Sequence, residues 1–251
     1  MVPLRILMVV TSHATMGDTG KPTGLWLEEL AVPYMQFIDA RADVTVTSIH
    51  GGKVPVDPRS LPPTGPEAPV VERFLANPAA ARILTHSLPL ESVDATRFDA
   101  VFLPGGHGTM FDFPVSLALA SALSRAWQAG RVVAAVCHGP AGLIGALDSD
   151  GKRVVAGRRV SAFTNSEEEA VGLAKAVPFL LQSKLESLGA TVETAANFQP
   201  FAIADGRLVT GQNPASARKA ADLTLETLAS VRARDRSGEG PARRTSPPAS
   251  S

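Results

Sequence analysis

The chain has 251 residues, enough to build one full hydrophobic core, and its 24 basic and 24 acidic residues cancel. A net charge of zero gives no electrostatic support for a partner such as nucleic acid or an anionic membrane. The single cysteine excludes an intramolecular disulfide framework and is typical of a reducing compartment, so we expect a cytoplasmic protein. The apolar N-terminal run is too short to span a membrane and predicts a strand rather than a signal peptide.

Buried-strand patterns alternate with helical patterns along most of the chain. This alternation predicts a mainly parallel sheet with helices on both faces, and ligands at the carboxyl ends of the strands. Strands are expected over 5–10, 42–48, 97–103, 132–136 and 190–194, short strands within 152–162, and helices over 25–37, 70–75, 116–129, 179–188 and 217–229. An Asp-Gly pair within 201–210 predicts a hairpin turn.

The C-terminal segment differs in composition from the rest of the chain. From Arg232 onward it consists mostly of Arg, Gly, Pro and Ser, with few apolar residues. Such a segment has little to bury. We therefore predict one α/β domain over residues 1–231 and a disordered tail over residues 232–251.

Cys137 stands at the junction of a predicted strand and a predicted helix. The apolar run Val132–Val136 ends at Cys137-His138-Gly139-Pro140, and small apolar residues follow. A nucleophile on such a sharp turn forms a nucleophile elbow. A thiol at a helix start favours the thiolate, so we expect a depressed pKa for Cys137. The alternative is that Cys137 is only a small buried apolar residue.

Several spaced motifs carry a family resemblance. The segments 104–108 (PGGHG), 136–140 (VCHGP) and 210–216 (TGQNPAS) resemble the DJ-1/PfpI superfamily, which has the class I glutamine amidotransferase-like fold. Residues 163–181 and 23–33 resemble its glyoxalase III-like chaperone branch. The resemblance implies a flavodoxin-like three-layer sandwich and a homodimer.

The same resemblance implies three partners for Cys137. His138 follows it directly, and Glu29 takes the position four residues before Pro33 in the first helix. An acid five residues after Phe163 is Glu168, although its neighbours Glu167 and Glu169 also remain open. For all these carboxylates the alternative is an ordinary solvated or helix-starting charge.

The resemblance also assigns supporting roles. The backbone N–H groups of Gly106 and His138 form the expected oxyanion hole, and Gly105, Trp26 and Asn213 are the expected substrate contacts. His107 is a candidate metal ligand, but no histidine pair has metal-like spacing on a helix, and the chain has no second cysteine. We therefore predict no metal and no cofactor.

The implied activity is the glutathione-independent conversion of methylglyoxal to lactate, as in a glyoxalase III-type lyase. The partner is then a small reactive carbonyl compound. Two alternatives remain open: a cysteine peptidase or amidase of the PfpI type, and a stress-responsive holdase or redox sensor in which the cysteine is oxidised.

Overall fold

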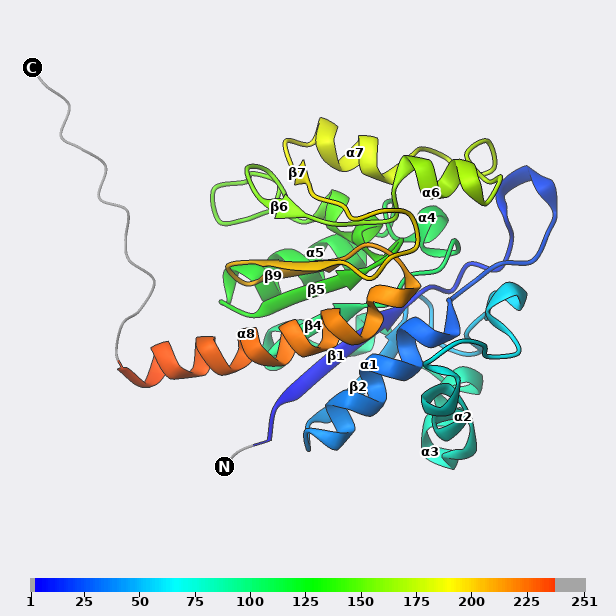
Figure 1. The fold of residues 1–251 in the computed structure, drawn as a ribbon. Coiled ribbons are helices and arrows are strands. Elements are labelled where there is room, and N and C mark those ends of the chain that lie inside the picture. The colour runs from blue at the N-terminus through cyan, green and yellow to red at the C-terminus, as the bar shows by residue number, and fades with distance from the viewer. Residues whose placement is uncertain (1–2, 238–251) are drawn as a thin grey trace, which may run out of the picture.

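A computed structural model describes residues 3–237 (Figure 1). The strands are β1 Arg5–Val10, β2 Asp43–Ser48, β3 Leu88–Pro89, β4 Ala100–Leu103, β5 Val132–Val136, β6 Arg159–Val160, β7 Thr191–Val192, β8 Ala202–Asp205 and β9 Leu208–Gly211. The helices are α1 Leu27–Asp39, α2 Ala68–Ala76, α3 Pro78–Thr85, α4 Thr109–Asp112, α5 Leu117–Gln128, α6 Asn165–Ala170, α7 Leu181–Ser187 and α8 Ala217–Ser237.

Seven strands form the central sheet in the order β3-β2-β1-β4-β5-β9-β8. All neighbouring strands in it are parallel except the edge pair β8 and β9, which is the predicted hairpin. Its turn contains Gly206 at a φ of 60°, as the Asp-Gly pair predicts. The short strands β6 and β7 pair in a separate two-stranded sheet.

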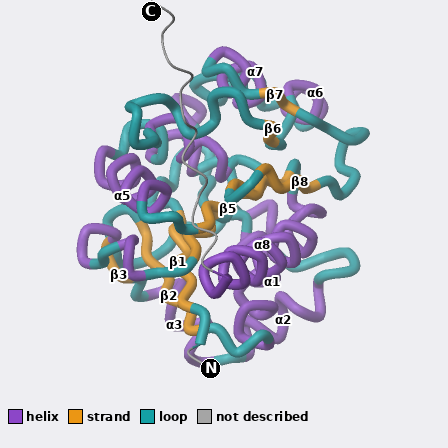
Figure 2. The backbone as a smooth tube through the Cα atoms, turned by 90° about the vertical axis from the view of Figure 1, so that its left-hand side faces the viewer, coloured by secondary structure: helices purple, strands orange, loops and turns teal. Residues whose placement is uncertain are grey.

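Helices cover both faces of the central sheet, giving three layers. Figure 2 shows α5 on one side of the strands and α1 with α8 on the other. Strand β1 serves both cores, because Ile6 and Met8 point to the α1 side while Leu7 and Val9 point to the α5 side. This is the flavodoxin-like sandwich that the motifs predict.

The structure differs from the sequence expectations at several elements. Helix α3 and strand β3 were not predicted, and residues 152–162 hold only the two-residue strand β6. The elbow leads into a 3-10 helix over Gly139–Gly145 instead of an α-helix. Pro33 lies inside α1, where a kink or irregular turn was expected.

The predicted tail boundary at Arg232 is wrong for residues 232–237, which continue α8. Arg232 also contacts the main domain, since its guanidinium donates to Asp99 at 3.1 Å and to the Pro3 carbonyl at 3.3 Å. The rest of the predicted tail, residues 238–251, lies outside the described residues. Within residues 3–237 no helix is both long enough and apolar enough to cross a bilayer.

Candidate active site

The carboxyl ends of β4, β5 and β9 lie at one edge of the sheet, where the loops after them meet. Cys137 begins the loop after β5 and has a φ of 60°, which is rare for a residue with a side chain. The loop passes close to β4, because a Cβ at Gly139 would come within 2.2 Å of the Leu103 carbonyl oxygen. Glycine is therefore required there, and the strained cysteine has the geometry of a nucleophile elbow.

His138 connects the cysteine to Glu168. The Cys137 Sγ lies 3.3 Å from His138 Nδ1, and His138 Nε2 lies 2.8 Å from Glu168 Oε2. All three residues are buried. Burial alone would raise the pKa of Glu168, but hydrogen bonds from two histidines hold it well below its usual range. The carboxylate is therefore ionised.

Glu29, from the first turn of α1, lies on another side of Cys137. Its side chain is fully buried, and its Oε2 accepts a hydrogen bond of 2.7 Å from the Gly105 N–H. Its Oε1 has no hydrogen-bond partner within residues 3–237, and the carboxyl as a whole interacts with the Cys137 thiol. Burial raises the pKa of Glu29 well above its usual range and so favours the protonated form of this carboxyl.

The expected depression of the cysteine pKa is wrong for this structure. Burial, followed by the neighbouring Glu29 carboxyl, raises the pKa of the Cys137 thiol. The short 3-10 helix after the elbow does not provide the α-helix start on which that expectation rested. Removal of the thiol proton therefore depends on a base, and His138 Nδ1 is in contact with the sulfur.

The acidic run at the start of α6 separates into three environments. Glu167 completes a capping box with Thr164 and is enclosed by hydrogen bonds from Phe198, Gln212 and Asn213. Glu168 faces the histidines, and Glu169 is exposed. Thr164 is the N-cap of α6, so the three glutamates belong to the helix, where successive side chains point in different directions. Glu168 is therefore the acid that contacts His138.

Two of the expected substrate contacts have other roles. Asn213 is buried, and its amide donates to Glu167 at 2.8 Å and to the Gln199 carbonyl at 2.9 Å. Both donors are occupied, so Asn213 joins the loop after β9 to α6 and is not free to bind substrate. Gly105 supports Glu29 and is not among the residues that line the cavity at Cys137.

A cavity of about 280 Å³ opens above the cysteine. Its polar lining includes Cys137, His138, Gly106, Arg59 and His107. Trp26, the third expected substrate contact, also lines it, together with Phe163, Val171, Phe198 and Pro214. The N–H of Gly106 has no acceptor within residues 3–237 and is available to a ligand oxygen, whereas the His138 N–H interacts with the sulfur.

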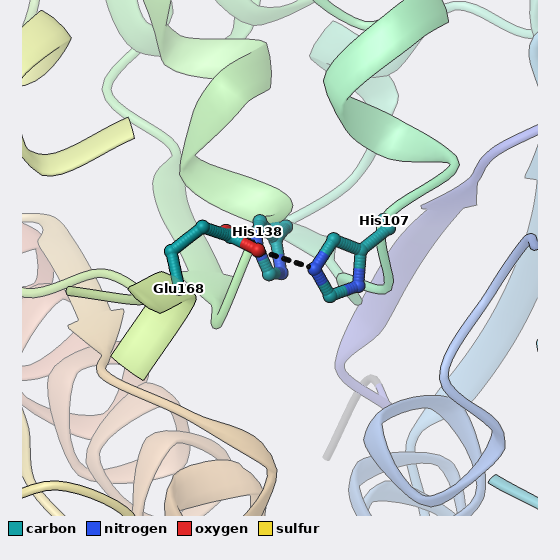
Figure 3. Close-up of side chains that lie close together, drawn as sticks. All are labelled: His107, His138 and Glu168. Carbon is teal, nitrogen blue, oxygen red and sulfur yellow. Dashed lines mark hydrogen bonds and ion pairs between the residues drawn. The ribbon is translucent and has the colours of Figure 1, made fainter. Parts of the chain in front are cut away.

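Two further residues belong to this site: Arg59, which carries no local signal in the sequence, and His107, which lies in the 104–108 motif but has no role assigned from it. Figure 3 shows His107 bonded to Glu168 beside His138, and its Nε2 lies 2.8 Å from Glu168 Oε1. Arg59, from a 3-10 helix over Pro58–Ser60, lies 3.0 Å from the other ring nitrogen of His107. His107, His138 and Glu168 offer ligand atoms within 4.8 Å of one another. The spacing argument against a metal site missed this cluster, because its members come from three separate segments.

Known proteins resemble the chain over most of its length. The glutathione-independent glyoxalase HSP31 of Saccharomyces cerevisiae is 32% identical over 247 aligned residues, covering 91% of this chain and 99% of the relative. The crystal structure of glyoxalase III from Candida albicans matches with a TM-score of 0.79 at 26% identity, covering 89% of this chain and 97% of that one. The Rapid Encystment Protein of 24 kDa from Francisella tularensis matches with a TM-score of 0.85 at 36% identity, covering 90% and 99%. The sequence profile of the DJ-1/PfpI family matches residues 83–227, and the chain belongs to this family.

Proposed function

We propose that the protein is a glutathione-independent glyoxalase that converts methylglyoxal to lactate. The observation that carries this proposal is that Cys137 lines a small apolar cavity and contacts both His138 and the buried carboxyl of Glu29. The glyoxalase activity in the names of HSP31 and glyoxalase III agrees with this arrangement.

The first step is attack on the aldehyde carbon. The Cys137 sulfur forms the new bond, its proton passes to His138 Nδ1, and the carbonyl π electrons move to the oxygen. The N–H groups of Gly106 and His138 are the donors proposed for this oxyanion. Return of the proton from His138 to the oxygen gives a neutral hemithioacetal.

The second step moves hydrogen between the two carbons. Glu29 gives its proton to the ketone oxygen and, as a carboxylate, takes the proton from the former aldehyde carbon, which leaves an enediol. Glu29 then delivers that proton to the former ketone carbon and recovers one from the hydroxyl on the former aldehyde carbon, which becomes the thioester carbonyl. The product is the lactoyl thioester, an isomer of the hemithioacetal, so no electrons leave the substrate. Water then releases lactate and restores the thiol.

The cavity dimensions favour a small substrate over a peptide. Methylglyoxal has five non-hydrogen atoms, which at about 30 Å³ each need about 150 Å³. The cavity of about 280 Å³ accommodates this, and a buried cysteine is poorly placed to meet a polypeptide backbone. We also propose a cytoplasmic homodimer, for which sedimentation equilibrium of the purified protein is the test of assembly.

The experiment is lactate release from methylglyoxal without added glutathione or metal. We expect activity in the natural protein and none in Cys137→Ala, with a generic peptide substrate left intact by both. Lactate formation retained by Cys137→Ala, or peptide cleavage in place of lactate formation, contradicts the proposal.

A further inference from the structure

The hydrogen bonds of the site continue past Glu168 to a cation. Glu168 Oε1 contacts His107 Nε2, and His107 Nδ1 contacts an amino nitrogen of Arg59. Arg59 in turn is held by both carboxylate oxygens of Asp57, at 3.0 and 2.6 Å. Asp57 is buried and also accepts from Thr23. The guanidinium is therefore fixed on the side of His107 away from the carboxylate.

The contact with Arg59 determines where His107 carries its proton. A guanidinium can only donate, so Nδ1 of His107 must accept. A neutral imidazole then has its proton on Nε2, which donates to Glu168. Glu168 accepts from His138 Nε2 with its other oxygen, and this leaves the Nδ1 of His138 without a proton, facing the Cys137 sulfur.

The same atoms form the alternative arrangement, a metal site. Two imidazoles and a carboxylate are a common ligand set for zinc, and the three ligand atoms lie within 4.8 Å of one another. To bind a metal through Nε2, His107 has to move its proton to Nδ1. That proton then points at an N–H of Arg59 across 3.0 Å, donor against donor.

We propose that Arg59 is a positioning residue that fixes the tautomer of His107, and that this contact keeps divalent metal ions out of the cluster of His107, His138 and Glu168. The use of His138 Nδ1 as the base that takes the proton of the Cys137 thiol rests on the proposed glyoxalase function. The tautomer and the exclusion of metal do not, since both are properties of the resting protein.

The direct test is two-dimensional ¹⁵N–¹H NMR of the full chain with labelled histidine, which distinguishes the two tautomers. We expect the rings of His107 and His138 to carry the proton on Nε2, assigned by the loss of signals in His107→Gln and His138→Gln. A proton on Nδ1 of His107 in the natural protein overturns the proposal, whatever its activity on methylglyoxal.

The second test compares Arg59→Met with Arg59→Lys. Methionine removes the donor but keeps much of the apolar stem, whereas lysine retains a donor that can reach the ring. Equilibrium dialysis against Zn²⁺ should show binding at least about tenfold tighter in Arg59→Met than in the natural protein, a factor equal to about 1.4 kcal/mol. Arg59→Lys should stay close to the natural protein, and Arg59→Met combined with His107→Gln should lose the gain.

Equal zinc binding by the natural protein and Arg59→Met contradicts the proposal, as does a gain that survives removal of His107. Melting temperatures of all variants show whether each is folded. If Arg59→Met is not, the tautomer seen by NMR in the natural protein and in Arg59→Lys decides the question.

Discussion

The Gly105 N–H donates to Glu29 Oε2 at 2.7 Å, and a Cβ at position 105 would come within 2.7 Å of that same oxygen. The close approach is possible only for glycine, because a side chain would push the carboxyl away from the backbone. This contact helps to hold a fully buried acid next to Cys137. It links the Gly-Gly motif after β4 to the first turn of α1, which are distant in the sequence.

Glu29→Gln should lower kcat for lactate formation by about 100-fold or more, the usual scale for general acid–base catalysis. The amide oxygen can still accept the Gly105 N–H, so the shape of the site is kept while proton transfer is lost. Steady-state kinetics of Glu28→Gln, one residue away in α1 and only half-buried, are the control. Similar losses in both variants would show that proton transfer by Glu29 is not the cause.

The same substitution should stabilise the protein at alkaline pH. Burial raises the folded-state pKa of Glu29 above its unfolded value of about 4.3, so the folded state binds more protons. The contribution of Glu29 to stability is therefore fully present below about pH 4.3 and is lost as pH rises towards the folded pKa. Thermal melting at pH 5 and pH 8 measures this. We expect the melting temperature of Glu29→Gln, relative to that of the natural protein, to be higher at pH 8 than at pH 5 by at least about 3 °C, which corresponds to about 1 kcal/mol. Exposed Glu169→Gln should gain nothing.

Glu168→Gln should reduce kcat by about tenfold, a smaller loss than that of Glu29→Gln. Glutamine offers one acceptor oxygen where the carboxylate accepts from His107 and His138, so one imidazole N–H would face the amide N–H. The pH–rate profile should shift, because His138 loses the carboxylate that accepts its Nε2–H. Kinetics of the adjacent Glu169→Gln provide the matched control. An unchanged profile in Glu168→Gln would mean that this carboxylate does not act through His138.

Alkylation of Cys137 should behave as that of a thiol rather than a preformed thiolate. Because burial raises its pKa, the rate of reaction with iodoacetamide should keep rising from pH 7 to pH 9. Mass spectrometry gives the rate, and no other thiol contributes, since the chain has one cysteine. A rate already constant at pH 6 would indicate a thiolate and contradict this prediction.

Ending the chain after Val231 should cost little stability. The truncation removes the contact of Arg232 with Asp99, a half-exposed ion pair of the kind worth up to about 1 kcal/mol. The melting temperature should fall by no more than about 4 °C relative to the full chain. A chain ending after Ser237 retains all of α8 and should melt with the full chain. A larger fall in this second chain would show that residues 238–251 contribute to the fold.

Local patterns in the sequence determine most of the fold. The β-branched run over 132–136, the alternation over 42–48 and the Asp-Gly turn at 205–206 each report the conformation of their own segment, and the structure has strands or a hairpin at each. Cys137 was identifiable because a strand, a sharp turn and small residues follow one another within a few positions. Helix α3 was missed because it is only eight residues long, and the extension of α8 because it is polar; such segments gain their stability from packing.

The roles of individual polar residues were decided only by the tertiary structure. Three consecutive glutamates look alike in sequence, but the turn of α6 buries Glu167 in a capping network, aims Glu168 at His138 and leaves Glu169 in solvent. Asn213 lies within a recognisable motif, yet its hydrogen bonds are used inside the protein. Arg59 and His107 are 48 residues apart, and their contact depends on how the fold brings two loops together, which no local sequence pattern predicts. The sequence by itself determined most of the elements and the position of Cys137 on a sharp turn after a strand, because backbone preference and periodicity are local. The tertiary structure decided which side chains share protons, because hydrogen bonding and burial depend on neighbours brought together from distant segments.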